Sequence, residues 1–330
     1  MNLSVLNSLF DSLPQIEKSN QLLTKNPTKI QWKGLSGSSK AFCVNSIAKS
    51  QSCNHLFILP DKEDAAYFFN DLESINEKSK HIFFFPESKD KAHDKNKIEN
   101  IDAISRAEVF ERCALGKKTW VVSYPDALSE KVPKRKELND KILTIQKGVC
   151  YSVEFFKELL IENKFEIVDF VYEPGQFSIR GGIVDIFSFG NDLPYRIELF
   201  GEEVDSIRSF DPASQLSKSN HDFCNITPNF NKAIEENAVQ SIFSLLGADS
   251  IVWCSSETSF LDSIENHFLR VNNSIKNDDD LITEHENILK RFLNPEGAKK
   301  QLSEMRVVEF GPEYSSSKKA VVTFDFKPQP

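Results

Sequence analysis

The sequence lacks the features of a membrane protein, a secreted protein or a metalloprotein. No stretch approaches the roughly 18 consecutive apolar residues of a membrane-spanning helix. Residues 1–6 carry neither the basic segment nor the apolar run of a signal peptide. The six cysteines stand at least ten residues apart, which excludes a C-x-x-C redox pair and a zinc knuckle, and the six histidines are scattered singly. These absences predict a cytoplasmic protein with reduced cysteines, no metal and no membrane partner.

The sequence also has fewer basic than acidic residues, and few glycines. The chain has 40 Lys and Arg against 49 Asp and Glu, a net charge of −9, which argues against tight non-specific binding of nucleic acid by the whole surface. Only 12 glycines stand beside 27 phenylalanines. Many of the phenylalanines lie in apolar runs such as residues 81–86 and are not interleaved with Arg and Lys. We therefore expect a Phe-rich core rather than a base-stacking surface.

A chain of 330 residues with 40% hydrophobic and 27% charged residues is expected to form two or three globular domains. Its first third alternates short apolar runs with helical patterns, which predicts a parallel sheet covered by helices. The predicted strands are 28–32, 55–59, 81–85 and 119–123, and the predicted helices are 40–50, 61–75 and 98–115.

The pattern changes at the charged, proline-containing stretch 133–137 and changes back after Asp211-Pro212. Between these points one predicted helix, 153–164, lies among predicted strands at 142–146, 166–172, 176–180, 183–187 and 195–200. Runs of neighbouring strands with short glycine-containing connections predict a small α+β domain with an antiparallel sheet. Strands at 250–254, 307–310 and 320–326 and helices at 258–270 and 283–292 are predicted beyond it.

A glycine-containing turn, Gly34-Leu-Ser-Gly37-Ser-Ser39-Lys40-Ala41, separates the first predicted strand from its helix. A phosphate-binding loop belongs at this place, since backbone N–H groups and a helix N-terminus face the anion there. Compared with G-x-x-x-x-G-K-[ST], Gly34 and Lys40 match, whereas Ser39 replaces the second glycine and Ala41 offers no hydroxyl to Mg²⁺. An apolar strand ending in Asp-Glu is not found in the sequence. The turn is therefore either an ordinary strand-to-helix connection or a vestigial nucleotide loop, and an active ATPase is not expected.

The stretch 172–212 reads as three or four short strands with tight turns. Period-two alternation places Arg196, Glu198 and Phe200 on one face and the apolar side chains of residues 195, 197 and 199 on the other, core-facing side. An exposed arginine, carboxylate and aromatic are typical of protein–protein hot spots. The alternative is a solvated strand face with a weak Arg–Glu pair.

This stretch resembles a signature shared by the N-terminal module of the bacterial transcription-repair coupling factors (Mfd) and the excision-repair helicase UvrB. The pattern is G-x-F-x-x-R-G-x-x-x-D-I-F, then P-x-R-I-E-x-F-x-x-E-x-x-S-I-R-x-F-D-P, over about forty residues. The loop at Gly34 aligns with the UvrB phosphate loop, and the resemblance extends weakly beyond residue 215. Two departures favour the coupling factors: Ser39 and Ala41 have lost the phosphate loop, and the loop 87–96 has no tyrosine where UvrB has a Tyr-rich DNA-gripping hairpin.

The resemblance implies an α/β fold in which a split, degenerate P-loop, helicase-like domain carries an inserted small α+β domain. The expected boundaries are 1–135 and 213–330 for the two halves and 136–212 for the insert. It also implies that the insert binds UvrA, the damage-recognition ATPase, through Arg180, Arg196 and Phe200, with Glu198 matching a carboxylate of UvrB. Ser178 stands where UvrB has an arginine. Arg180 has the alternative role of bracing Asp185.

The function that follows from the resemblance is recruitment of UvrA in nucleotide excision repair, without ATPase activity or a cofactor of its own. RNA polymerase, DNA, ATP and Mg²⁺ are expected to be bound by other parts of a longer parent protein, beyond a boundary near residues 327–330. One alternative is a UvrB-like DNA helicase fragment that binds ATP and damaged DNA. Another is a generic α/β nucleotide-binding domain, and a nucleotide titration separates both from the first function.

Overall fold

A computed structural model describes residues 3–76, 81–88, 98–230, 239–276, 285–311 and 320–324. The chain forms two compact units. Unit 1 comprises residues 1–87, 117–132 and 239–330, and unit 2 comprises residues 88–116 and 133–238. Within the described parts, no helix is long and apolar enough to cross a membrane. Most of the loop predicted over 87–96 lies outside the described residues.

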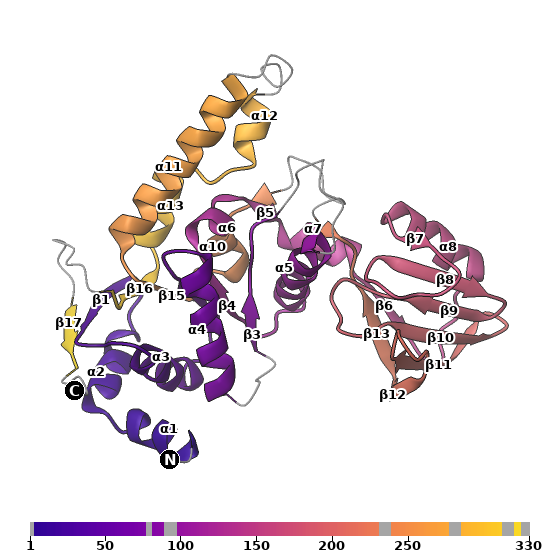
Figure 1. Cartoon of the computed structure of the whole chain (residues 1–330), viewed down its shortest axis with the longest axis horizontal. Helices are drawn as coiled ribbons and strands as arrows, with labels where there is room; N and C mark the ends of the chain where they lie inside the picture. The colour runs from indigo at the N-terminus through magenta and orange to yellow at the C-terminus, as the bar shows by residue number, and fades with distance from the viewer. Residues whose placement is uncertain are drawn as a thin grey trace. The chain divides into compact units, whose positions relative to one another are not determined.

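Unit 1 is built on a seven-stranded sheet in the order β17-β1-β16-β15-β2-β4-β3, and every neighbouring pair is parallel (Figure 1). The strands are β1 (Thr28–Lys33), β2 (His55–Ile58), β3 (Ile82–Phe84), β4 (Trp120–Ser123), β15 (Ile251–Cys254), β16 (Arg306–Glu309) and β17 (Ala320–Thr323). The parallel sheet predicted from the alternation of apolar runs and helical patterns is confirmed.

The helices of unit 1 pack against this sheet and against one another. They are α1 (Leu3–Asp11), α2 (Pro14–Leu22), α3 (Ser39–Ser50), α4 (Lys62–Ile75), α6 (Pro125–Ser129), α10 (Ile242–Leu246), α11 (Glu257–Lys276), α12 (His285–Lys290) and α13 (Pro295–Ser303). Helix α3 packs against α1, α2 and α4, whereas α11 packs against α6 and α13. Helix α4 begins where the sequence predicts, because the Asp61 carboxylate accepts a hydrogen bond from the Asp64 N–H at 2.9 Å.

Aromatic rings fill the interior of unit 1. Trp32 and Trp253 are buried and meet edge-on at 5.2 Å, and the Trp253 ring lies 6.0 Å from that of Phe57. His55 is fully buried beside them and accepts a hydrogen bond from the Trp253 indole N–H at 3.0 Å. Burial lowers the pKa of His55 well below its ordinary value, so the ring is neutral.

Unit 2 contains an almost wholly antiparallel six-stranded sheet in the order β12-β11-β10-β9-β8-β7. Its strands are β7 (Glu166–Ile167), β8 (Gln176–Arg180), β9 (Ile183–Ile186), β10 (Tyr195–Phe200), β11 (Glu203–Phe210) and β12 (Ser217–His221). The unit also holds α5 (Ile98–Ala114), α7 (Arg135–Lys141), α8 (Val153–Glu162) and the antiparallel pair β6 (Leu143–Gln146) and β13 (Phe223–Ile226). The short strands β5 (Val132–Pro133) and β14 (Val239–Gln240) lie where the chain passes between the units.

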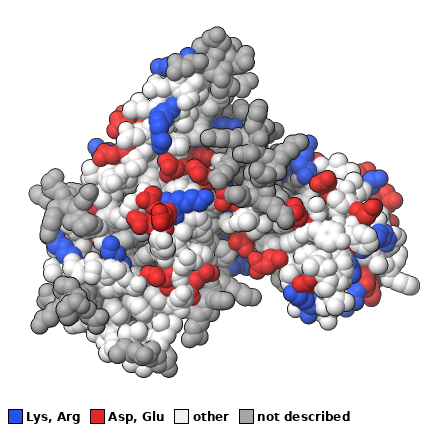
Figure 2. Space-filling model, viewed as in Figure 1, with Lys and Arg blue, Asp and Glu red and all other residues white. Residues whose placement is uncertain are grey.

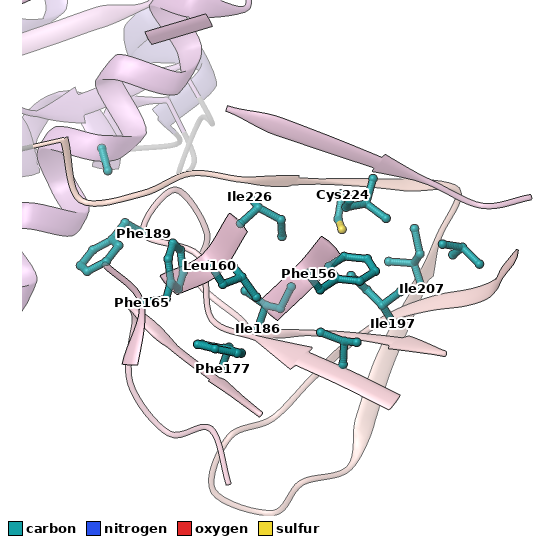
Figure 3. Packing of buried hydrophobic residues seen from close by; sticks show 14 of the residues in the cluster. Phe156, Leu160, Phe165, Phe177, Ile186, Phe189, Ile197, Ile207, Cys224 and Ile226 are labelled. Atoms are coloured by element: carbon teal, nitrogen blue, oxygen red, sulfur yellow. The ribbon is translucent and has the colours of Figure 1, made fainter. Parts of the chain in front are cut away.

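The core of unit 2 lies between one face of the large sheet and helix α8 (Figure 3). Phe156 and Leu160 of α8 pack there with Phe177, Ile186 and Ile197 from three neighbouring strands. These residues are almost inaccessible to solvent, and each large side chain buried in this way contributes about 1.5–3 kcal/mol. Together with the rings of unit 1, they confirm the expected Phe-rich core.

Unit 2 begins and ends at other residues than the predicted insert, 136–212. It includes α5, because Ala103 and Ala107 pack in its core and the buried Glu111 carboxylate accepts hydrogen bonds from Asn225 and Thr227. It also includes residues 213–230, since β12 extends the large sheet and β13 pairs with β6. The hydrogen bonds of Glu111 join residues that are 114 and 116 positions apart, and the local sequence pattern carries no signal for them.

The strand predicted over residues 166–172 is also shorter than expected. It ends at Ile167, and the chain bends at Asp169 and Phe170. Beyond the bend, a side chain forms the hydrogen bonds of the backbone: the Gln176 amide oxygen accepts from the Tyr172 and Glu173 N–H groups, both at 2.9 Å. These bonds replace a sheet ladder.

Candidate functional site

The candidate partner-binding residues lie on the face of the unit 2 sheet that faces away from α8. Arg196, Glu198 and Phe200 alternate along β10 with Ile197, which is buried in the core, as the sequence predicts. Arg180 comes from β8. The structure therefore brings all four predicted residues onto one face of one sheet, here called the β10 face.

Asp185 organises the arginines of this face. Its carboxylate on β9 is completely buried and accepts hydrogen bonds from Arg180 Nη2 at 2.5 Å, Arg196 Nε at 2.7 Å and Arg196 Nη2 at 2.8 Å. The hydrogen bonds to Asp185 raise the pKa of Arg196 above its ordinary value, so this side chain is always charged. Bracing of Asp185 by Arg180, the alternative weighed from the sequence, is confirmed.

Arg196 is directed into the protein rather than toward solvent. Its Nη1 and Nη2 groups also donate to the backbone and side-chain oxygens of Gln215, at 3.4 and 3.2 Å, and its guanidinium lies 4.5 Å from the centre of the Phe210 ring. Only 17% of the Arg196 side chain is exposed, against 37% for Arg180. Arg180 therefore has the greater capacity to meet a partner.

Glu198 is held by the neighbouring strand β11. Its carboxylate pairs with Arg208 and accepts a hydrogen bond from the Ser206 hydroxyl at 2.8 Å. Arg196 and Arg208 stand directly opposite each other in the ladder, an arrangement of like charges that is unfavourable by itself. Asp185 and Glu198 compensate these two charges, one on each side.

Phe200 is the most exposed large apolar residue among those described, with 85% of its surface accessible. It ends β10, and Gly201 continues into a two-residue turn with a φ of 65°. Ser178, in contrast, is 2% exposed and donates to the Asp169 carbonyl oxygen at 2.9 Å, so it offers no surface contact. An exposed aromatic ring that shares a face with arginine and carboxylate side chains is typical of protein–protein hot spots.

Four partners of these residues were not predicted from the sequence: Arg208 and Ser206 around Glu198, and Phe210 and Gln215 around Arg196. A two-residue turn at Gly201 pairs Phe200 with Glu203, and counting back along both strands from there gives Glu198–Asp205. The observed pairs are Glu198–Ser206 and Arg196–Arg208, because the register shifts by one residue between Glu198 and Leu199. Turn length alone therefore does not predict these partners.

The Gly34 loop lies in unit 1, between β1 and α3. Gly34 and Gly37 both have positive φ, and a side chain at Gly34 would meet the Phe324 carbonyl oxygen at 2.0 Å. The Ser39 hydroxyl is turned back to the Ser36 carbonyl oxygen at 2.6 Å, and the Lys40 ammonium lies 5.9 Å from the centre of the Phe310 ring.

The donor set of this loop does not suit Mg²⁺ and a triphosphate. Ala41 is fully buried and offers no oxygen, and β15 is followed by Ser255 and Ser256 rather than by carboxylates. In the described part of the chain, no group of three or more His, Cys, Asp and Glu side chains could hold a metal ion. All six cysteines are free thiols, and burial raises the pKa of Cys43 and Cys113 to about 12.

Comparisons with known proteins agree with this geometry. Residues 143–231, which include the whole β10 face, match the family described as the UvrB interaction domain. The chain is 29% identical over 225 residues to the transcription-repair-coupling factor of Bacillus subtilis (strain 168), which covers 68% of this chain and 18% of that protein. It is 32% identical over 103 residues to the protein of the same name from Escherichia coli (strain K12), covering 31% of this chain and 9% of that one. It is 37% identical over 100 residues to the protein of the same name from Staphylococcus aureus (strain Mu50 / ATCC 700699), covering 30% of this chain and 8% of that one.

The chain thus spans less than a fifth of the length of these relatives. The resemblance to the N-terminal module of the transcription-repair coupling factors is confirmed by these matches. The fold class is also confirmed, with a seven-stranded parallel sheet and a second, mostly antiparallel sheet.

Proposed function

We propose that this chain is the UvrA-recruiting module of a transcription-repair coupling factor and acts in nucleotide excision repair without ATPase activity of its own. The observation that carries the proposal is the exposure of Phe200 on the β10 face, within the region that matches the UvrB interaction domain. A phenylalanine that leaves 85% of its surface in water contributes little to folding and is suited to bury its ring in a partner.

Within this proposal the residues of the β10 face have different roles. Phe200 and the exposed part of Arg180 contact UvrA, and Glu198 presents a carboxylate that Arg208 holds in place. Arg196 contributes mainly by supporting the face, since its donors are directed at Asp185 and Gln215. A loss of UvrA binding in Arg196→Ala could therefore come either from a lost contact with UvrA or from disruption of the sheet.

Phe200→Ala is the sharper test. Calorimetric titration with purified UvrA should show binding by the parent chain and a loss of about 2 kcal/mol, roughly thirtyfold in Kd, for this variant. Phe223→Ala is the matched control, because Phe223 is an exposed phenylalanine of the same unit on a different sheet. Equal affinity of parent, Phe200→Ala and Phe223→Ala would remove the β10 face from the proposal, and no binding by the parent would remove the function itself.

We also propose that the Gly34 loop does not bind MgATP, which argues against a UvrB-like helicase fragment. Supporting observations are the buried Ala41 methyl group in place of a hydroxyl, and the side chain of Lys40 lying over Phe310. In a longer protein we expect ATP, DNA and RNA polymerase to be engaged by parts outside these 330 residues.

A further inference from the structure

The edge of the large sheet of unit 2 is open beside Arg180. Strand β7 pairs with only the first half of β8, through Glu166–Gln176 and Ile167–Phe177, and the chain then bends away. Two side chains of β8 hold the departing segment: Ser178 Oγ and Arg180 Nη1 donate to the Asp169 carbonyl oxygen at 2.9 and 3.2 Å. Side-chain bonds thus take the place of backbone ladder bonds at this point.

The backbone of Ile179 faces this open edge. The Phe177 carbonyl oxygen accepts from the Val168 N–H at 2.9 Å, so the backbone of Phe177 points toward β7. Because a strand repeats every two residues, the N–H and C=O of Ile179 point the same way. No hydrogen bond joins them to residues 168–170 or to any other described residue beyond the edge. An exposed sheet edge with an unpaired donor and acceptor is a template for another strand.

A hollow of about 690 Å³ lies at this edge, with residues 167–170 on one wall and 178–180 on the other. Ile167 and Phe170 are 58% and 50% exposed, which provides apolar area along the first wall. The Arg180 guanidinium lies 5.0 Å from the centre of the Phe170 ring and donates to Asp169 and Asp185, which leaves three of its five N–H groups for a further acceptor.

These features fit a protein strand better than a small molecule. A small-molecule site encloses most of its ligand and surrounds it with side chains. This hollow is open along one side and has backbone groups at its base, the arrangement used in strand addition, where main-chain bonds give affinity and side-chain pockets give specificity. It also continues into the β10 face through Arg180.

We infer that the hollow beside β8 receives an extended segment of the partner protein, which pairs with the Ile179 backbone. The segment places an apolar side chain against Ile167 and Phe170 and a carboxylate on Arg180, with which it forms charge-assisted hydrogen bonds. This inference rests on the proposed function and names the element by which the partner engages Arg180.

Amide hydrogen exchange of the intact chain, free and saturated with purified UvrA, tests the pairing directly. The Ile179 amide should exchange rapidly in the free chain and become at least about tenfold slower in the complex, because it then donates a hydrogen bond. The Ser178 amide is the internal reference, since it belongs to the ladder with β9 in both states. An Ile179 amide that remains unprotected in the saturated complex overturns the inference.

Two substitutions at one position separate backbone from side chain. Ile179→Pro removes the edge-facing N–H without touching the bonds to β9, and it should weaken UvrA binding about tenfold or more. Ile179→Ala keeps the N–H and should bind within about threefold of the parent. If Ile179→Pro and Ile179→Ala bind UvrA with the same affinity, and circular dichroism verifies that both are folded, strand addition is contradicted while the proposed function stands. If the parent chain does not bind UvrA, both proposals fail.

Discussion

Replacement of Asp185 by alanine removes the one carboxylate that two arginines of the β10 face share. The side chain is completely buried and accepts three hydrogen bonds from charged donors. Removal of one partner of a buried ion pair typically costs about 3–5 kcal/mol, because the other charge stays behind uncompensated. Here Arg180, with 37% of its side chain exposed, can turn into solvent, whereas Arg196 at 17% cannot turn freely. We therefore expect Asp185→Ala to destabilise unit 2 by about 3 kcal/mol, the low end of that range.

The distribution of tryptophan makes the assay specific. All three tryptophans, Trp32, Trp120 and Trp253, belong to unit 1, so their fluorescence follows that unit, while far-ultraviolet circular dichroism follows both. In urea, Asp185→Ala should leave the fluorescence transition in place and move the remaining transition down by about 1.5 M, for a slope near 2 kcal/mol per M.

Asp205→Ala is the matched control, because it removes an exposed aspartate from the neighbouring strand β11 and should move neither transition. Asp185→Asn keeps one acceptor oxygen and should lose about half as much stability as alanine. Equal midpoints for Asp185→Ala and Asp205→Ala would refute the view that the buried carboxylate holds this face together.

Four further outcomes are expected. Titration calorimetry should detect no MgATP binding by the parent chain, and micromolar, Mg²⁺-dependent binding that Lys40→Ala abolishes would contradict the vestigial loop. Gel shifts at about 150 mM salt should show at most weak DNA binding. The net charge is −9, and basic and acidic side chains are interspersed on the face seen in Figure 2. Sub-micromolar affinity for DNA would contradict this expectation. The pKa of His55 is lowered in the folded state, so the unfolded chain binds more protons below pH about 6.5. The stability of unit 1 should therefore fall by up to about 1.4 kcal/mol per pH unit on acidification. The fall should be less steep in His55→Phe, which has no imidazole to protonate. Gly190→Ala should destabilise unit 2 by about 2 kcal/mol or more, since the new Cβ would lie 2.1 Å from the buried Glu111 Oε2. An unchanged unfolding transition of unit 2 would show instead that the Glu111 carboxylate can move aside.

Local sequence signals predicted most strands of both sheets. They gave no separate range for β11, and they did not predict β12, which lies where the pattern of the first third was expected to resume. Apolar runs located β1, β2 and β4, and the cap at Asp61 located the start of α4. Alternation along β10 separated the core side of the sheet from the side that carries Arg196, Glu198 and Phe200. These signals depend on neighbours within one turn or one strand, and the sequence contains that information directly.

Features decided by tertiary contacts were not predicted. Helix α5 follows a strand of unit 1 in the sequence but packs in unit 2, through Ala103, Ala107 and the hydrogen bonds of Glu111. Strand β7 ends early because side chains of β8 take the backbone carbonyl of Asp169. The same holds for the site. The surface residues could be named from the sequence, whereas the hydrogen bonds of Asp185 to two arginines from different strands depend on how the sheet is assembled.

The interleaving of the two units along the chain has a consequence for synthesis on the ribosome. Strand β15 lies in the middle of the unit 1 sheet, between β16 and β2, yet it follows unit 2 in the sequence. When residue 238 has been made, every segment of unit 2 exists, but β2 still lacks the neighbour that covers one of its edges. Nascent domains fold as soon as they are complete. The unit that carries the β10 face is therefore complete first, and the unit 1 sheet closes only after β15 and β16 have followed.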